Sequence, residues 1–240
     1  MGGVKMGRKS AVQLLGMFFF VLLAGCVTAA AVKKPSAPIH KMALVSLTVS
    51  NWMGMVSGTA GDVKAAELIN STFAGLLTRT ESKLGGVKPL IKLSSFIDNP
   101  TYRSFNVKSD VPLMFPKVNG TPVVNFSKTE NDIIAANLNP ETAKKLCATL
   151  QVDAVVVFYS EWAAAQGHFV PMRRALAKNV VSVWDRSGNL VFNTRVDETS
   201  DAVIGGPYVT VVNVGTIKNW AEAYNKSLDQ IVIQMKAALK

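Results

Sequence analysis

The run from Ala154 to Tyr159, AVVVFY, constrains the fold of this chain more than any other stretch. A strand with one solvent-facing side alternates apolar and polar residues, whereas an uninterrupted apolar run of this length is typical of a strand that is buried on both faces. Such a strand needs a covering layer on each side. We therefore predict an α/β domain in which 154–159 is a central parallel strand.

The predicted elements alternate between strands and helices along the chain. Parallel pairing is expected where a helix connects two strands, and antiparallel pairing is expected in the hairpin around the turn DRSGN. This pattern predicts one α/β domain with a mixed sheet of about five strands flanked by helices. In chain order we predict strand 42–50, helix 61–86, strand 87–96, an irregular excursion at about 97–126, helix 127–137, helix 141–150, a strand from 154, a loop at 162–174, hairpin 179–197, strand 208–214 and a terminal helix from 219.

Polar residues are predicted to cap three of these helices. Asn139 precedes Pro140, which is the usual order of an N-cap and a first-turn proline. Ser127 and Asn219 each have a glutamate three residues later, which is the spacing of a capping box. The glycine pair at 85–86 predicts the end of the long helix.

Residues 1–25 have the composition of a secretory signal. Lys5, Arg8 and Lys9 form a positive start without any acidic residue, and an almost uninterrupted apolar run follows at 11–24. This run is shorter than the roughly 20 apolar residues that a bilayer-spanning helix needs. We therefore favour a signal peptide over a true membrane anchor.

Cys26 ends this region, and a lone cysteine can be a nucleophile, a metal ligand, half of a disulfide or an attachment point. The stretch LAGC at 23–26 resembles the lipobox of bacterial lipoproteins. The resemblance implies that the Cys26 thiol is acylated and that Cys26 becomes the mature N-terminus; two or more acyl chains suffice for stable anchoring. Val27 stands where an aspartate is associated with retention in the inner membrane, so the resemblance implies the periplasmic face of the outer membrane.

These observations divide the chain into three parts. Residues 1–25 are the predicted signal peptide, 26–41 an acylated tether rich in small residues and proline, and 42–240 the periplasmic domain. If Cys26 is acylated, Cys147 has no partner for an intrachain disulfide. Cys147 lies in a predicted helix beside apolar residues, so we expect a buried cysteine and not a reactive thiol.

The chain is basic, with a net charge of +10, of which Lys5, Arg8 and Lys9 contribute three. A basic surface favours anionic partners such as lipid headgroups, acidic polymers or nucleic acid, and it also keeps a protein soluble. The sequence has no arginine-rich cluster, zinc-ligand set or RNA-binding signature, so we do not expect a nucleic-acid partner.

A second resemblance covers roughly 42–96 and 139–240. The helix and strand at 141–162, with LQVDAVVV, are followed by the hairpin VWDRSGNLVF and a terminal amphipathic helix. This arrangement is similar to periplasmic lipoproteins related to the curli secretion-channel subunit and to the penicillin-binding-protein activator LpoB, and to the N-terminal domain of TolB. The resemblance implies an outer-membrane lipoprotein without a cofactor that acts by binding an envelope protein or by self-association, in cell-wall synthase activation, secretion or envelope assembly.

Residues for catalysis or metal binding do not form a recognisable set in the sequence. His40 and His168 are isolated, and the chain has no GxSxG or HExxH motif and no paired cysteines. Asp153 and Glu161 bracket the central strand, and we expect Asp153 to hydrogen-bond a loop. We therefore predict a protein that is not an enzyme and holds no metal, with a carrier of an envelope ligand or a cell-wall hydrolase as the alternatives.

The excursion at about 97–126 combines aromatic and basic residues with four prolines. Long loops in compact domains are often functional, and aromatic and arginine side chains are enriched in protein interfaces. The candidate partner-binding residues are Tyr102, Arg103, Phe105 and Phe115. The alternative is that these aromatic side chains fold back on their own domain.

Overall fold

The structure, a computed structural model, describes residues 33–50, 63–111, 113–166, 172–206 and 214–240. Cys26, His168 and the predicted strand residues 208–213 lie outside this part of the chain. No helix within the described residues is long and apolar enough to cross a membrane.

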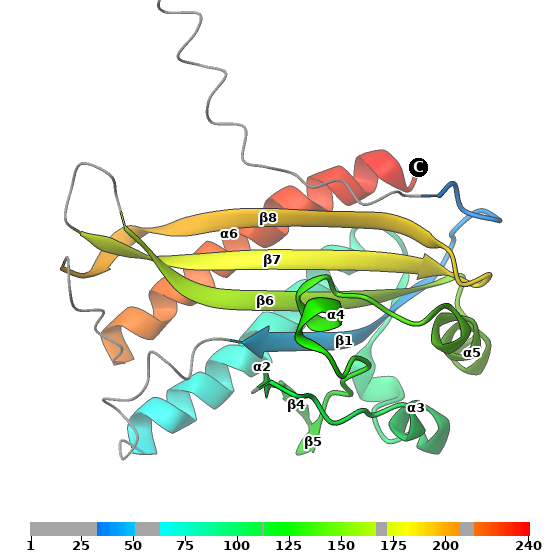
Figure 1. Cartoon of the computed structure of the whole chain (residues 1–240), viewed down its shortest axis with the longest axis horizontal. Coiled ribbons are helices and arrows are strands. Elements are labelled where there is room, and N and C mark those ends of the chain that lie inside the picture. Colours follow the sequence, from blue (N-terminus) through cyan, green and yellow to red (C-terminus); the bar gives the residue numbers. More distant parts are fainter. Residues whose placement is uncertain (1–32, 51–62, 112, 167–171, 207–213) are drawn as a thin grey trace, which may run out of the picture.

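The predicted mixed α/β sheet is confirmed. The main sheet has the strand order β2-β1-β6-β7-β8, and a sixth strand, β3, pairs with the end of β1. Figure 1 shows β1, β6, β7 and β8 side by side. β1 is parallel to both β2 and β6, whereas β6, β7 and β8 form an antiparallel meander. The strands are β1 Met42–Ser50, β2 Leu90–Ile91, β3 Leu113–Met114, β6 Ala154–Gln166, β7 Arg173–Asp185 and β8 Leu190–Gly205.

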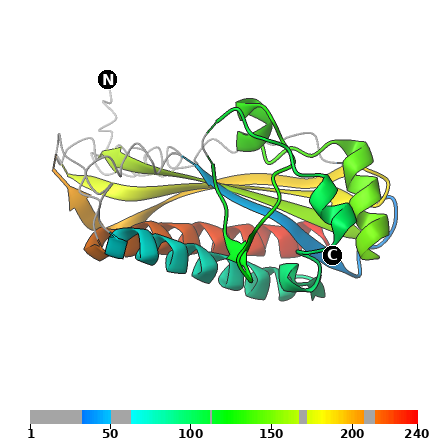
Figure 2. The ribbon, with the colours of Figure 1, turned by 90° about the horizontal axis from the view of Figure 1, so that it is seen from below.

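Two long helices cover one face of this sheet (Figure 2). They are α2, Val63–Gly85, and α6, Val214–Ala238. Tyr224 of α6 packs its ring 5.4 Å from that of Phe158 in β6, and its hydroxyl lies 2.6 Å from the Thr80 hydroxyl of α2. Because both hydroxyls are buried, this bond satisfies polar atoms that would otherwise destabilise the layer.

Shorter helices lie on the opposite face. α5, Pro140–Leu150, packs on β6 and β7, and α4, Glu130–Ile134, packs on β6. The side chain of Ser182 in β7 donates a hydrogen bond to the carbonyl oxygen of Ala136. The central run of β6 is therefore covered on both sides, as its continuous apolar sequence predicted.

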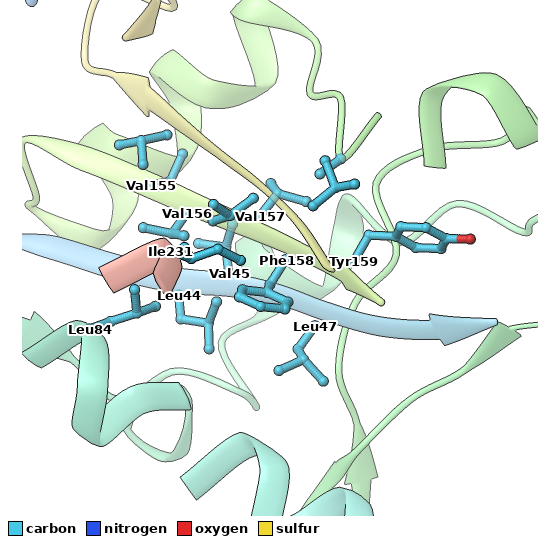
Figure 3. Close-up of a cluster of buried hydrophobic side chains, with 14 of the residues drawn as sticks. Leu44, Val45, Leu47, Leu84, Val155, Val156, Val157, Phe158, Tyr159 and Ile231 are labelled. Carbon is cyan, nitrogen blue, oxygen red and sulfur yellow. The ribbon is translucent and has the colours of Figure 1, made fainter. Parts of the chain in front are cut away.

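The main hydrophobic core lies around β1 and β6. Figure 3 shows Leu44 and Leu47 of β1 beside Phe158, with Leu84 of α2 and Ile231 of α6 close to them. All five of these side chains are fully buried. The core therefore joins the central parallel pair to both long helices, as the α/β pattern requires.

Several predicted boundaries are confirmed, and others are wrong. The Asn139 side chain accepts hydrogen bonds from the backbone N–H groups of Glu141 and Thr142, as an N-cap should. The cap predicted at Ser127 is wrong, because Thr129 caps α4 and Ser127 instead donates to the carbonyl oxygen of Asn137. α4 also ends earlier than predicted, at Ile134.

The meander is longer than the sequence indicated. The predicted loop at 162–174 is wrong at both ends, since β6 continues to Gln166 and β7 begins at Arg173. The strand predicted at 87–96 is reduced to β2, followed by the short 3-10 helix η2, Leu93–Ser95. α6 begins at Val214, so Asn219 lies inside the helix and does not cap it.

Candidate functional site: the docked N-terminal segment and the excursion

Residues 33–41, which we call the docked segment, pack on the folded domain. These residues are part of the predicted tether at 26–41. At its start, the Lys33 N–H donates to the carbonyl oxygen of Leu190, at 2.9 Å, and at its end Ile39 is buried. The docked segment follows the end of the sheet at which β1, β2 and β6 begin (Figure 1).

Asp185 holds the middle of the docked segment. Its Oδ2 accepts hydrogen bonds from the backbone N–H and the hydroxyl of Ser36, at 2.9 and 2.8 Å. Its Oδ1 accepts from the N–H groups of Ser187 and Asn189, both at 2.9 Å, within the β7–β8 turn. One carboxylate therefore fixes the turn and ties it to a residue 149 positions away in the sequence.

The charge state of Asp185 follows from these contacts. Burial raises the pKa of its carboxyl, but the hydrogen bonds from Ser36 and Asn189 favour the ionised form and together lower the pKa below its usual value. Asp185 is therefore ionised at neutral pH, where the five hydrogen bonds that its carboxylate accepts are strongest.

Asp153 holds the other end of the docked segment. Its Oδ2 accepts hydrogen bonds from the backbone N–H groups of His40 and Lys41, at 2.8 and 2.9 Å, and its Oδ1 forms an ion pair with Arg186. The expectation that Asp153 hydrogen-bonds a loop is confirmed. This loop belongs to the predicted tether, which no local pattern around Asp153 indicated.

The β7–β8 turn is built for close packing. Gly188 has φ of +76°, which is unfavourable for other L-residues. A Cβ atom at this position would lie 2.6 Å from the carbonyl oxygen of Pro140, at the start of α5. Gly188 therefore allows the turn that carries Asp185 to pack directly against α5.

The excursion covers the free edge of β1 between its contacts with β2 and β3. The Tyr102 hydroxyl donates to the carbonyl oxygen of Val45, at 2.7 Å, and accepts from the N–H of Val124, at 3.2 Å. The Ser46 hydroxyl donates to the carbonyl oxygen of Val124, at 2.8 Å. The bond from Tyr102 occupies the Val45 carbonyl, and the Ser46 bond fixes the excursion along an edge that would otherwise be open to another strand.

Tyr102 cannot serve as a partner-binding surface, which corrects the prediction for this residue. Its side chain is fully buried, and its ring contacts Phe96 edge-on, with centroids 5.0 Å apart. Burial raises the pKa of its hydroxyl, which stays protonated. The alternative that the aromatic residues fold back on their own domain therefore holds for Tyr102.

The other three candidate residues remain partly accessible. Arg103 is half-buried and donates through Nη1 to the carbonyl oxygen of Pro122, at 2.6 Å. Phe105 packs partly against the core, and Phe115 is half-buried. The structure keeps all three in the excursion but does not join them into one exposed cluster, so a partner site there stays a prediction.

Cys147 lies in α5, where it is buried. Burial raises the pKa of its thiol to about 12, and the nearby Asp185 charge acts in the same direction. A thiol with this pKa is almost entirely protonated at neutral pH. Within the described residues, no group of three or more His, Cys, Asp or Glu side chains could hold a metal ion.

Comparisons with known proteins give weak similarities. No family model and no curated protein matches the chain. Among solved structures, the hypothetical protein CT253 from Chlamydia trachomatis is 14% identical, with a TM-score of 0.40, over 85% of this chain and 98% of that one. A PelC dodecamer from Paraburkholderia phytofirmans is 10% identical, with a TM-score of 0.31, over 87% and 96% of the two chains.

A third solved structure is lipoprotein GNA1162 from Neisseria meningitidis. It is 13% identical to this chain, with a TM-score of 0.32, and the match covers 82% of this chain and 98% of that one. These weak similarities include a lipoprotein but carry no functional argument. What this protein does must be argued from its own residues.

Proposed function

We propose that this chain is a lipid-anchored, non-catalytic protein on the periplasmic face of the outer membrane that binds an envelope protein. The observation that carries the proposal is the short distance between the candidate lipid attachment site and the folded domain. Cys26 follows a signal-like segment, and Lys33, the first described residue, comes only seven positions later and bonds to the domain.

This spacing determines how far the domain extends from the anchor. Seven residues span at most about 25 Å, whereas a free tether from Cys26 to Lys41 would span roughly 50 Å. With the docked segment in place, the domain stays close to the bilayer. Such a protein is suited to partners near the membrane surface, in cell-wall synthase activation, secretion or envelope assembly.

Metabolic labelling with palmitate tests the anchor. Wild-type protein and a Cys147→Ala variant should both incorporate label, because the Cys147 thiol is buried and protonated. A Cys26→Ala variant should incorporate none and should leave the membrane fraction. Label retained in Cys26→Ala would refute the lipoprotein assignment.

Photo-cross-linking in intact cells tests the binding role. A photoreactive amino acid at Phe105 or Phe115 should give a discrete adduct with an envelope protein or with a second copy of the chain. The same amino acid at Lys236, on the exposed side of α6, is the matched position outside the excursion. A protein that stays uncross-linked at both excursion positions would contradict this surface as the partner site.

A further inference from the structure

Four lysines lie at the end of the domain that carries the docked segment. Lys33, Lys34 and Lys41 belong to the segment itself and are exposed. Lys88 is half-exposed and lies next to them, because the Met42 N–H donates to the carbonyl oxygen of Pro89, at 2.8 Å. None of the four forms an ion pair with another described residue.

The two acidic residues that contact the docked segment point inward. Asp185 is 1% exposed, and the side chain of Asp153 is 13% exposed. Both carboxylates are occupied by the backbone of the docked segment and of the turn, and Asp153 also by Arg186. Around the docked segment the charges are therefore separated: two carboxylates hold the segment from inside, and its lysines face the solvent.

This basic end is also the end nearest Cys26. The seven peptide units from Cys26 to Lys33 have a root-mean-square span of roughly 15 Å if they are flexible, and the screening length in 0.1 M salt is about 10 Å. A link of this length lets the lysines approach the bilayer that holds the acyl chains to within the screening length. The inner surface of a bilayer with anionic phospholipids attracts such juxtamembrane basic groups.

We propose that this end of the domain is a lipid-binding surface at which Lys33, Lys34, Lys41 and Lys88 contact the phosphate groups of anionic phospholipids. The strands then stand end-on to the bilayer, and the opposite end of the meander points away from it. The proposal rests on the proposed lipid anchor at Cys26. It adds a second, electrostatic attachment that fixes the orientation of the domain.

Fluorescence quenching on vesicles tests the orientation. The full chain, purified with its acyl groups, is reconstituted in phosphatidylcholine vesicles with or without phosphatidylglycerol and with a quencher on the lipid headgroups. One fluorophore is attached at Ala37→Cys in the docked segment, and a second, in a separate sample, at Val203→Cys near the far end of β8. Ala37 is exposed and Val203 is 42% exposed. Leu190 and Val203 are 13 residue steps apart along β8, which separates the two ends by roughly 43 Å.

The expected result is strong quenching at Ala37 and little at Val203 in vesicles that contain phosphatidylglycerol. Quenching at Ala37 should fall when the ionic strength is raised to about 1 M, where the screening length is about 3 Å. Each lysine near an anionic surface changes the membrane-binding equilibrium by about five-fold. Lys33→Gln, Lys34→Gln and Lys41→Gln together should therefore lower the ratio of domains in contact with the lipid surface to domains away from it by roughly 100-fold.

The matched control removes the same charge elsewhere. Lys108→Gln, Lys117→Gln and Lys128→Gln change three exposed lysines in and just after the excursion, and they should leave quenching at Ala37 unchanged. Equal quenching at Ala37 with and without phosphatidylglycerol, or in the variant that lacks the docked-segment lysines, would overturn the proposal. Tight binding of short DNA in the absence of vesicles, with loss of quenching when DNA is added, would overturn it in favour of a nucleic-acid site.

Failure of the anchor gives a different result. If Cys26 is not acylated, its free thiol takes up the fluorophore in wild-type protein, and the protein does not float with phosphatidylcholine vesicles. Acylated protein that floats but shows no quenching at Ala37 refutes the lipid-binding surface alone.

Discussion

Replacement of Asp185 by alanine should release the docked segment and destabilise the domain. The substitution removes the acceptor of five hydrogen bonds, two from Ser36, one from Ser187 and two from Asn189. Hydrogen bonds to charged groups contribute about 1.5–3 kcal/mol each when both partners are buried. Ser36 is exposed, so water replaces part of its loss, and the expected cost to the free energy of unfolding is about 3 kcal/mol.

Two measurements check this prediction. Guanidinium unfolding of the purified protein should show a lower midpoint with an unchanged slope for Asp185→Ala. Hydrogen exchange at the Ser36 amide should become faster by roughly 30-fold if about 2 kcal/mol of protection is lost. The control is Asp197→Ala, which removes an exposed carboxylate that pairs with Arg195 and should cost at most about 1 kcal/mol.

The reasoning would be refuted if Asp185→Ala cost no more than Asp197→Ala and left exchange at Ser36 unchanged. The docked segment would then be held by other contacts, or would not be held in solution. In either case the short distance between Cys26 and the domain would lose its main structural support.

Three further perturbations test other parts of the structure. Tyr102→Phe leaves the Val45 carbonyl and the Val124 N–H without their buried partner, and urea unfolding should show a loss of about 1–3 kcal/mol in the free energy of unfolding. Tyr159→Phe loses one partly buried contact to Ser50 and should cost less, so equal costs would contradict the role of Tyr102 at the β1 edge. Gly188→Ala adds backbone strain and a clash with Pro140, so it should lower the thermal unfolding midpoint more than Gly120→Ala. Gly120 has a similar φ of +83° but open space around it, so similar losses would mean that the turn does not pack tightly against α5. Because the folded-state pKa of Asp185 is depressed, its stabilising effect is fully present above the unfolded-state pKa of about 3.9 and is lost as the pH falls through the lower folded-state pKa. Acid unfolding of Asp185→Asn should therefore lack part of the stability loss that the wild-type protein shows below about pH 4. Identical acid-unfolding profiles would refute this linkage.

The central layer of the fold could be predicted because its signals are local. The apolar run at 154–159 indicates burial on both faces, and the hairpin turn and the Asn139 cap depend on residues a few positions apart. Strand ends were less predictable. β6 and β7 continue past the apolar run because they pair with each other over 13 positions, and that pairing has no local signal.

The docked segment and the role of Tyr102 could not be predicted from local pattern. Residues 33–41 are small, polar or proline-bearing, as in a tether, and only their contacts with Asp153 and Asp185 fix them on the domain. Tyrosine is a residue type that is common in protein interfaces, but the Tyr102 hydroxyl donates a hydrogen bond to the Val45 carbonyl at the edge of β1. In both cases the partner is more than 50 positions away in the sequence.

The central claim is that Cys26 is an acylated N-terminus from which the domain is held near the membrane. Intact-mass spectrometry of the protein purified from membranes, with sequencing of its N-terminal peptide, tests this claim most directly. We predict a mature chain that begins at Cys26 and carries the added mass of acyl groups on that residue. A chain that retains residues 1–25, or that carries an unmodified Cys26, would contradict it.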